Sequence, residues 1–477
     1  MQTLNPQSMP LVGQSLIEAS AGTGKTYTIT GLYLRCLLGL QTTEDQMPLS
    51  VDQILVVTFT EAATQEIKDR VRTRIIAARD ALLGAPCDDE LIGAVLEQVT
   101  DQRAAFALLD AAAKSMDEAA IFTIHGFCQR MLKQHAFESN VAFNLEFILD
   151  ESELIIESVK DHWRSFIYPL DKDTTEAILT HFSSPHALVS KVMKVLSKGN
   201  AELTPHYELT DVLSARKAYQ SEAMAFKARL STSDFFTVLA NSDLAKNKAP
   251  GRAANINALR DYCDGAQWYF EFGTAKHSFN LWSEELLLDS HYYKKNGQCI
   301  VHPMLSEFSK LAKLHAQVSQ GLPLAIVQHA SKSVKSLLKA HKLKHGLITP
   351  DDLLSNLHDA LNCEQGHVLR RKIAELYPVA MIDEFQDTDL MQYQIFNTIY
   401  GQQDDAGLLM IGDPKQAIYS FRGADIFTYI KARKMVKNHY TLGTNYRSTP
   451  MMVDGVNSLF EQSSAPFIYR DDIGFTP

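Results

Sequence analysis

The sequence predicts an α/β fold, in which a parallel sheet is interrupted by a large, mainly helical insertion. Strand-like and helix-like segments alternate over residues 1–145 and again over 347–445, which is the pattern of a parallel sheet covered by helices. Residues 146–346 between them are mostly helical in pattern and are broken by polar or Gly/Pro-containing segments. Residues 446–477 start a further domain without completing it, so we expect the chain to be truncated.

Short apolar runs predict the strands, and longer periodic segments predict the helices. The expected strands are QSLIEAS (14–20), QILVVTF (53–59), AAIFTIH (119–125), PVAMID (378–383), GLLMIGD (407–413) and HYTL (439–442). The expected helices of the α/β part are 24–39, 61–83, 390–400 and 426–436.

The composition is that of an ordinary globular protein, with 45% hydrophobic and 21% charged residues. No apolar run approaches the ~18–20 residues of a membrane helix, and the N-terminus lacks the basic start and apolar core of a signal peptide. The six cysteines contain no CxxC spacing, so we expect neither a disulfide nor a metal framework, and a cytoplasmic location. The formal net charge of −10 is weak evidence against nucleic-acid binding, but it leaves room for a local basic groove.

The stretch LIEASAGTGKTYTI predicts a phosphate-binding loop, because a strand precedes its glycines and a helix follows Gly24-Lys25-Thr26. The N–H groups of such a loop and of the helix N-terminus form an anion site. Lys25 would reach the β- and γ-phosphates of ATP, and the Thr26 hydroxyl would bind Mg²⁺. The usual first glycine is Ala19 here, and the alternative is a glycine-rich turn with a surface lysine. The candidate nucleotide-binding residues of the loop are Ala19, Ser20, Ala21, Gly22, Thr23, Gly24, Lys25 and Thr26.

Three carboxylates, Asp383, Glu384 and Asp387, follow the strand predicted at 378–383. Unpaired carboxylates are costly to desolvate, so we expect a cation beside them, and Mg²⁺ that carries ATP is the predicted one. Asp383 would hold the metal, and Glu384 would orient or deprotonate the attacking water. The alternative is a solvated acidic loop after a strand.

Six blocks occur in the order found in UvrD/Rep-type superfamily 1 DNA helicases, which the chain resembles. They are ASAGTGKT, VVTFTEAATQEI, FTIHGFCQRML, MIDEFQDTD, IGDPKQAIYSFRGAD and TNYRS. Within that family, the amino-acid sequence of several blocks is most similar to that of the motor subunits of helicase–nucleases. The resemblance implies a RecA-like P-loop domain, a second RecA-like domain beginning at 446–477, and ATP-driven 3′-to-5′ movement along single-stranded DNA. It also implies partner subunits, duplex DNA ends as substrates, and a role in recombination and double-strand break repair.

The resemblance extends the nucleotide site beyond the loop. Gln416 follows a strand end, where it would bond the γ-phosphate or the attacking water and link nucleotide state to DNA contact. The resemblance assigns Tyr446 to the adenine face and Arg447 to the γ-phosphate; the alternative for Arg447 is an ordinary arginine at a helix start.

The resemblance also implies residues along a DNA strand. Phe59, Tyr419 and Phe421 would stack on bases, with core packing as the alternative for the last two. Arg422 would bind a phosphate or an internal carboxylate, Thr60 is also a candidate helix cap, and a histidine such as His125 is as often structural. The candidate DNA-binding residues are Thr58, Phe59, Thr60, Thr123, His125, Phe127, Tyr419, Phe421 and Arg422.

Several features of the family are not clear in this sequence. Neither Gln7 nor Gln14 has convincing context as the adenine-reading glutamine, and a second arginine and a nuclease domain are not found. The alternative function is therefore a nucleotide-, DNA- or partner-binding module without turnover. A run of basic residues from Lys332 to Lys344 has helical spacing and predicts either a solvated face or a nucleic-acid backbone contact.

Overall fold

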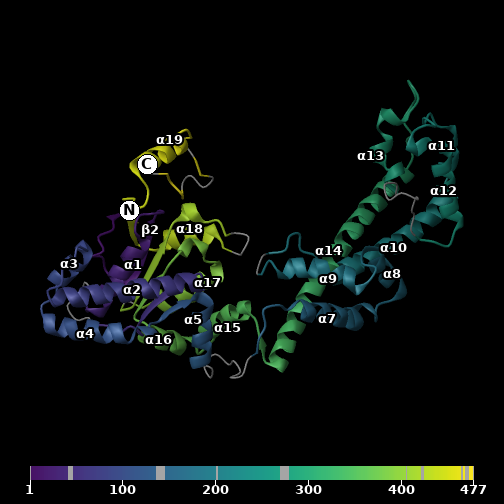
Figure 1. Cartoon of the computed structure of the whole chain (residues 1–477). Helices are drawn as coiled ribbons and strands as arrows, with labels where there is room; N and C mark the ends of the chain where they lie inside the picture. Colours follow the sequence, from purple (N-terminus) through teal and green to yellow (C-terminus); the bar gives the residue numbers. More distant parts are fainter. Residues whose placement is uncertain are drawn as a thin grey trace. The chain divides into compact units, whose positions relative to one another are not determined.

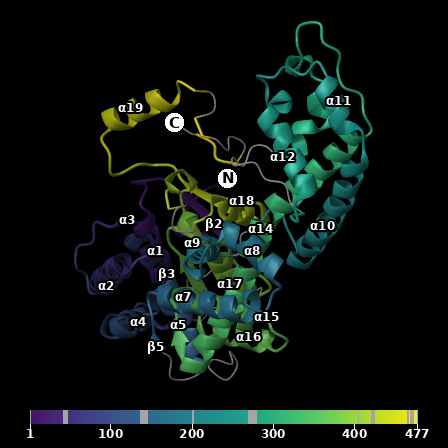
Figure 2. The ribbon, with the colours of Figure 1, turned by 90° about the vertical axis from the view of Figure 1, so that its right-hand side faces the viewer.

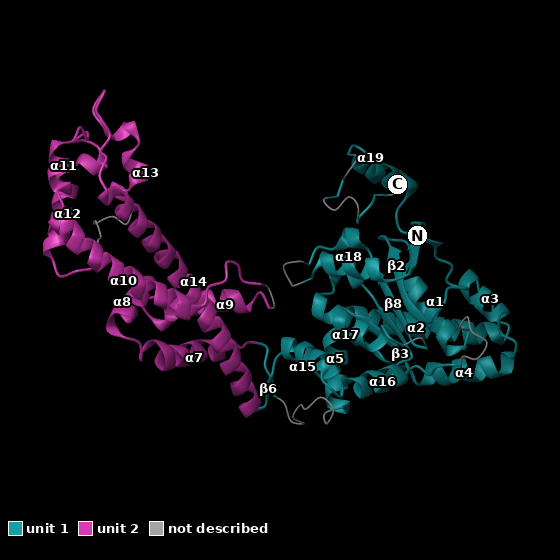
Figure 3. Cartoon of the chain, turned by 180° about the vertical axis from the view of Figure 1, so that it is seen from behind, with its two compact units in different colours: residues 1–149, 346–477 teal, residues 150–345 magenta. Residues whose placement is uncertain are grey.

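The computed structural model describes residues 2–40, 47–135, 146–199, 202–268, 279–403, 405–419, 424–463, 466–467 and 472–475. The chain forms two compact units (Figure 3). The first comprises residues 1–149 and 346–477, and the second comprises residues 150–345.

The first unit is built on a seven-stranded sheet with the order β1-β9-β2-β8-β7-β3-β4, in which every neighbouring pair is parallel. The prediction of an α/β fold with a parallel sheet is therefore confirmed. The strands are β1 (Gln2–Thr3), β2 (Gly13–Ala19), β3 (Ile54–Thr58), β4 (Ile121–Thr123), β7 (Val379–Ile382), β8 (Gly407–Gly412) and β9 (Asn438–Leu442). Because parallel strands all end at the same edge, the loops that follow them meet there.

Helices cover both faces of this sheet, since successive side chains of each strand point to opposite sides (Figure 1). Val379 and Met381 of β7 join one apolar core, and Ala380 and Ile382 join the other. The first core includes α1 (Lys25–Leu37), α2 (Glu61–Leu82), α3 (Glu90–Glu97) and α4 (Gln102–Lys114). The second includes α5 (Ile124–Gln134), α15 (Pro350–Asn362), α16 (Gly366–Leu376), α17 (Leu390–Tyr400) and α18 (Ile426–Met435).

Local capping explains where the helices after the insertion begin. The Thr349 hydroxyl accepts from the Asp352 amide at the start of α15, and Asp389 accepts from the Gln392 amide at the start of α17. Both form capping boxes, which satisfy amides that a helix N-terminus otherwise leaves unpaired. Short turns η1 (Met116–Glu118), η6 (Phe385–Asp387) and η7 (Pro414–Gln416) complete the loops of this unit.

The two chain segments that bracket the insertion pair with each other. β5 (Glu146–Phe147) and β6 (Leu347–Ile348) form a short parallel ribbon, with Glu146 opposite Leu347 and Phe147 opposite Ile348. The ends of the insertion therefore lie side by side in the first unit.

Helix α19 (Pro450–Phe460) differs from the other helices of the first unit, because none of its residues is buried. It stands apart from the sheet in both Figure 1 and Figure 2. Its exposed side chains include Met451, Met452 and Leu459, so it presents apolar surface to solvent.

The second unit is helical, with two apolar cores along one long helix, α14 (Met304–His345). The first half of α14 packs in an aromatic-rich core with α10 (Leu209–Thr232), α11 (Phe235–Asn241), α12 (Ala253–Asp264) and α13 (Glu284–Leu287). The second half packs with α7 (Ser152–His162), α8 (Lys172–His181) and α9 (Pro185–Leu196). A π-helical segment, η2 (Trp163–Ile167), continues α7. Short 3-10 turns are η3 (Ala249–Gly251), η4 (Phe279–Trp282) and η5 (Ser290–Tyr292). No helix in the described ranges has the length and apolar character needed to span a membrane.

The basic run of α14 is divided in the structure. Lys332, Lys335 and Lys339 are exposed, whereas the Lys342 ammonium lies 3.0 Å from a Glu151 carboxylate oxygen. Lys342 is therefore used within the second unit, and only part of the run forms a solvated basic face.

A buried histidine, His162, makes the stability of the second unit depend on pH. His162 is 1% exposed, and its ring centroid lies 5.2 Å from that of His329. Burial and the neighbouring His329 lower the pKa of His162 to about 4. The unfolded chain, with a histidine pKa of ~6.5, binds more protons between these values, so stability is complete above pH 6.5 and is lost as the pH falls toward 4.

We expect the free energy of unfolding of this unit to be about 2 kcal/mol lower at pH 5 than at pH 7 because of His162. All three tryptophans, Trp163, Trp268 and Trp282, lie in this unit, so tryptophan fluorescence during urea unfolding reports on it alone. The exchange His162→Phe should remove most of the pH dependence, whereas changing the exposed His206 to Ala should not. If the free energy of unfolding of His162→Phe depended on pH as strongly as that of the parent chain, the assignment of this dependence to His162 would be contradicted.

Candidate functional site

The predicted phosphate loop lies between β2 and α1, at the edge of the sheet where the strands end. Gly24 caps α1 with a φ of 90°, and Gly22 has a φ of 80°, values that favour glycine. Gly22 also lacks room for a side chain, since a Cβ there would lie 2.5 Å from Asn445 Oδ1 and 2.8 Å from Arg447 Cβ. The sequence motif therefore matches the backbone that it needs, although Ala19 is a buried residue at the end of β2.

The cation that meets the carboxylates in this structure is Lys25. Its ammonium donates to Glu384 Oε2 at 2.6 Å, which joins the phosphate loop to the end of β7. Glu384 has a φ of 51° and is one of the two non-glycine residues with a positive φ in the described part of the chain. Strained backbone of this kind is concentrated at functional sites.

Asp383 has no such partner. Its Oδ1 atom is buried and makes no hydrogen bond, and burial together with the charge of Glu384 raises its pKa to about 6. Burial and the same charge raise the pKa of Asp387 to about 6, and its Oδ1 is also buried without a partner. A buried carboxylate oxygen beside a phosphate loop fits a divalent cation, because Mg²⁺ prefers oxygen ligands and is bound through one or two carboxylates and phosphates. Thr26 lines the same pocket as Asp383 and Glu384.

The loop after β8 brings Gln416 to the site. Asp413 is 3% exposed, and its Oδ2 accepts from Gln416 Nε2 at 2.7 Å. Gln416 lines the same pocket as Lys25 and Glu384, and Asp413 holds its amide; its contact with the γ-phosphate stays a prediction.

The loop after β9 closes the site on the other side of the phosphate loop. The Tyr446 amide donates to the Gly22 carbonyl at 2.9 Å, and Asn445 Oδ1 accepts from the amides of Arg447 and Ser448. The Tyr446 ring is 80% exposed and lines the pocket with Arg447. Asn445 was not among the predicted site residues, although it belongs to the TNYRS block.

A pocket of about 390 Å³ connects these loops. Its lining contains most of the predicted nucleotide-binding residues and also Tyr27, Glu66 and Arg70, which sequence reasoning missed. The signal for Glu66 and Arg70 was their i,i+4 spacing in the first turns of a helix that starts at the same sheet edge; they form an ion pair of 2.7 Å. The pocket residues are Ser20, Ala21, Gly22, Gly24, Lys25, Thr26, Tyr27, Ala63, Glu66, Ile67, Arg70, Asp383, Glu384, Gln416, Tyr446 and Arg447.

Tyr27 is held in place by two charged residues. Its hydroxyl donates to Asp89 Oδ1 at 2.7 Å, and the Arg74 guanidinium lies 4.0 Å from its ring centroid. Arg74 also donates to Asp89 Oδ2 at 2.7 Å. One flank of the pocket therefore carries an aromatic ring with a fixed orientation.

Two of the predicted DNA contacts are corrected by the structure. Thr58 is 1% exposed, and its hydroxyl bonds the Thr64 hydroxyl at 2.6 Å, so it stabilises the turn into α2. Phe127 is fully buried and stacks on Phe396, at 5.4 Å between ring centroids. Neither side chain reaches a surface that a DNA strand can contact, because both contribute to the packing of the first unit.

The remaining DNA candidates lie at the sheet edge. Phe59, which follows β3, stacks on Tyr419, which follows β8, with 5.8 Å between ring centroids. Both rings are partly exposed. Phe421 and Arg422 lie outside the described residues.

Thr60, Thr123 and His125 are at least partly accessible, and the two threonines also have local roles. Thr60 accepts from the Ala63 amide as the N-cap of α2, which is the alternative that the sequence left open. Thr123 caps α5 and donates to Glu61 Oε1 at 3.1 Å.

Neither glutamine considered for adenine recognition lines the pocket. Gln14 lies at the start of β2, at the opposite end of the strand from the phosphate loop, and its amide donates to Asn397 Oδ1 at 3.0 Å. The Gln7 amide N–H bonds the Asn5 side chain in the preceding loop.

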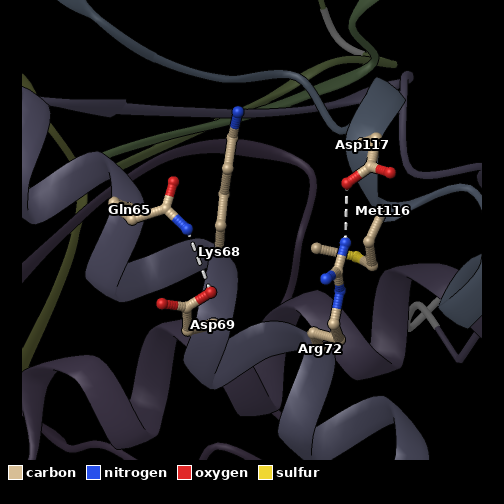
Figure 4. Close-up of a pocket in the computed structure, with 6 residues that line it drawn as sticks. All are labelled: Gln65, Lys68, Asp69, Arg72, Met116 and Asp117. Atoms are coloured by element: carbon tan, nitrogen blue, oxygen red, sulfur yellow. Dashed lines mark hydrogen bonds and ion pairs between the residues drawn. The ribbon is translucent and has the colours of Figure 1, made fainter.

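A second pocket, of about 140 Å³, lies on α2 beside η1 (Figure 4). In it Gln65 donates to Asp69 at 3.0 Å and Arg72 pairs with Asp117 at 2.7 Å. None of the predicted site residues lines it, so we assign no function to it.

Comparison with known proteins agrees with this arrangement. The chain is 39% identical over 483 residues to "RecBCD enzyme subunit RecB" of Escherichia coli (strain K12), which covers the whole chain and 40% of that relative. It is 38% identical over 512 residues to the protein of the same name from Haemophilus influenzae, covering 99% of the chain and 42% of that relative. The protein of the same name from Mycolicibacterium smegmatis is 27% identical over 468 residues, which covers 96% of the chain and 31% of that relative. The chain thus spans about two fifths of the length of the first two relatives.

A family model, the UvrD/REP helicase N-terminal domain, matches residues 2–437, which is most of the chain. The match contains every strand of the sheet up to β8 and the insertion between them. The chain therefore belongs to the UvrD/REP helicase family.

Proposed function

We propose that this protein is an ATP-dependent 3′-to-5′ DNA helicase and translocase, the motor subunit of a helicase–nuclease of the exodeoxyribonuclease V type. The observation that carries the proposal is the ion pair of Lys25 and Glu384 at 2.6 Å, beside Asp383, whose Oδ1 atom is buried and makes no hydrogen bond. ATP hydrolysis requires a phosphate-binding cation, a general base and a metal-binding carboxylate. Lys25, Glu384 and Asp383 line one pocket and would supply these three groups.

Each side chain has a role that follows from its position. Bound Mg²⁺, held by Thr26 and Asp383, would neutralise charge on the β- and γ-phosphates. Lys25 would exchange Glu384 for phosphate oxygens, which frees the Glu384 carboxylate to accept a proton from the attacking water. Gln416 and Arg447 would bond the γ-phosphate, and Tyr446 would cover the adenine.

The DNA strand would follow the sheet edge, where Phe59 and Tyr419 offer aromatic surface and Thr60, Thr123 and His125 offer polar groups. We extend this proposal to Phe421 and Arg422. Single-stranded DNA and duplex ends are the proposed substrates, and the process is the repair of double-strand breaks by recombination in the cytoplasm. RecC- and RecD-type subunits are the proposed partners, since the relatives' name refers to a RecBCD enzyme.

The exposed apolar face of α19 supports a further proposal, that residues 446–477 begin a second RecA-like domain. Exposed apolar surface of this kind is typical of an interface. In this proposal, residues 1–145 and 347–445 form the first RecA-like domain, and residues 146–346 form a helical domain inserted in it.

The test is ATP hydrolysis by this chain, with and without single-stranded DNA. We expect Mg²⁺-dependent turnover that DNA stimulates, and a loss of nucleotide affinity of at least tenfold in Lys25→Ala, because the lysine supplies a charge-assisted bond to phosphate. Lys68→Ala, which changes a lysine of the second pocket on α2, is the matched control and should leave both quantities unchanged. Nucleotide binding without turnover would instead support a binding module, and the absence of both would contradict the proposal.

A further inference from the structure

Gln386 is a buried side chain to which the proposed hydrolysis mechanism assigns no role. It is 2% exposed and lies in η6, two residues after Glu384. Its Nε2 donates to Glu384 Oε2 at 2.7 Å, the same oxygen that receives the Lys25 ammonium. Its Oε1 accepts from the backbone amide of Asp413 at 2.9 Å.

Only a carboxamide satisfies both of these contacts. The end near Glu384 must donate, because a carboxylate only accepts, and the end near Asp413 must accept, because a backbone amide only donates. A glutamate at this position would bring a third carboxylate beside Glu384 and Asp387, whose Oδ2 lies 3.4 Å from Gln386 Nε2. Because the side chain is buried, each lost bond would leave a desolvated polar group.

The packing leaves this side chain little freedom. A Cβ on Gly412 would lie 2.5 Å from Gln386 Oε1 and 3.1 Å from the Gln386 amide nitrogen. The last residue of β8 is therefore a glycine at the point where the carboxamide passes against the strand.

The loop that Gln386 contacts is the one that carries both a predicted phosphate-facing residue and a predicted DNA-facing residue. Asp413 holds Gln416 through its side chain, and six residues further along Tyr419 stacks on Phe59. A continuous series of hydrogen bonds thus runs from Lys25 through Glu384, Gln386 and Asp413 to Gln416.

We propose that Gln386 is a positioning residue that ties the Glu384 carboxylate to the 413–419 loop, so that a displacement of this loop by DNA changes the position of Glu384. The inference rests on the proposed function for its effect on catalysis, but the link between Glu384 and the loop is a property of the chain alone. A two-state element that both sites contact is what a coupling between them requires.

The link can be tested without turnover, by hydrogen exchange of the chain and its Gln386→Met variant. Methionine keeps the volume but neither donates to Glu384 nor accepts from Asp413, so the Asp413 amide should exchange at least tenfold faster, while the amides of β7 remain unchanged. Gln392→Met is the matched control: this glutamine is also buried and caps α17, but it has no bond to the 413–419 loop. Unchanged exchange at Asp413 in Gln386→Met would overturn the proposal.

The consequence is tested by ATP turnover of the same variants. We expect Gln386→Met to lower DNA-stimulated kcat by at least tenfold with the KM for ATP within twofold, and Gln392→Met to preserve the ratio of stimulated to unstimulated rates. Gly412→Ala should reproduce the loss of DNA-stimulated turnover, because its Cβ would displace the Gln386 carboxamide. This variant replaces Gln386→Met in the test if Gln386→Met fails to fold. Faster exchange at the Asp413 amide, together with an unchanged ratio of DNA-stimulated to unstimulated turnover, would overturn the proposed coupling between the loop and Glu384. An inactive parent chain would contradict the proposed function, and the exchange result would still decide whether the link exists.

Discussion

Glu384→Gln is expected to lower the rate of ATP hydrolysis by about 10²–10⁴-fold and to leave nucleotide binding intact, because it removes a general base and keeps the shape of the side chain. The amide oxygen can still accept from Gln386, so the local geometry that the φ of 51° imposes should persist. Nucleotide affinity should be equal or higher, since Lys25 no longer has an anionic partner to leave.

The measurement is steady-state turnover together with equilibrium binding of a fluorescent nucleotide. Asp387→Asn is a suitable control, because it also replaces a carboxylate by an amide near the same turn, at a buried residue that lies outside the pocket lining. Turnover of Glu384→Gln within threefold of the parent would rule out the proposed role of Glu384.

Arg447→Ala is expected to have the second large effect, a loss of about 10³–10⁵-fold in turnover, because an arginine at the γ-phosphate stabilises charge that develops during phosphoryl transfer. Arg447 is exposed at the pocket, and no carboxylate in the described part of the chain pairs with it. Its backbone is fixed by Asn445 and its Cβ packs against Gly22, so the guanidinium starts close to the phosphate loop.

Arg70→Ala provides the comparison for this prediction. Arg70 lines the same pocket but is already paired with Glu66 at 2.7 Å, so its loss should have a much smaller effect on turnover. Arg447→Lys should recover only part of the rate, because an ammonium cannot bond two phosphate oxygens with the planar geometry of a guanidinium. If Arg70→Ala were the more damaging change, the assignment of Arg447 would be wrong.

The sequence predicted the sheet and its edge well, because the apolar strand runs and the loops that follow them are local features. Helix α17 was predicted with the bounds that the structure has, since its capping residue Asp389 and its apolar pattern are both local. The contact of Lys25 with Glu384 was not predicted, although both residues were assigned to one site. The sequence does not show which side chain of the site lies nearest to the Lys25 ammonium.

The residues that sequence reasoning missed or misplaced depend on long-range packing. Gln386 belongs to the MIDEFQDTD block, but the sequence predicted no role for it, because its second partner is the backbone amide of Asp413, 27 positions away. Phe127 lies in a motif at the sheet edge, yet α5 turns its ring into the core, where it meets Phe396. Arg70 reaches the pocket only because α2 starts at the edge that β3 shares with β2 and β7.

The order of the strands has a consequence for how this protein is made on the ribosome. Among the strands that the structure describes, β2 pairs with β8 and β9 alone, and both are synthesised after the insertion. About 390 residues separate the end of β2 from the start of β8, which takes about 20–80 s at ~5–20 residues per second. The helical insertion, whose contacts are more local, can fold during that time. The apolar strand β2 therefore stays unpaired until β8 and β9 are synthesised. We expect chaperones that bind extended apolar segments to bind the nascent chain during this interval.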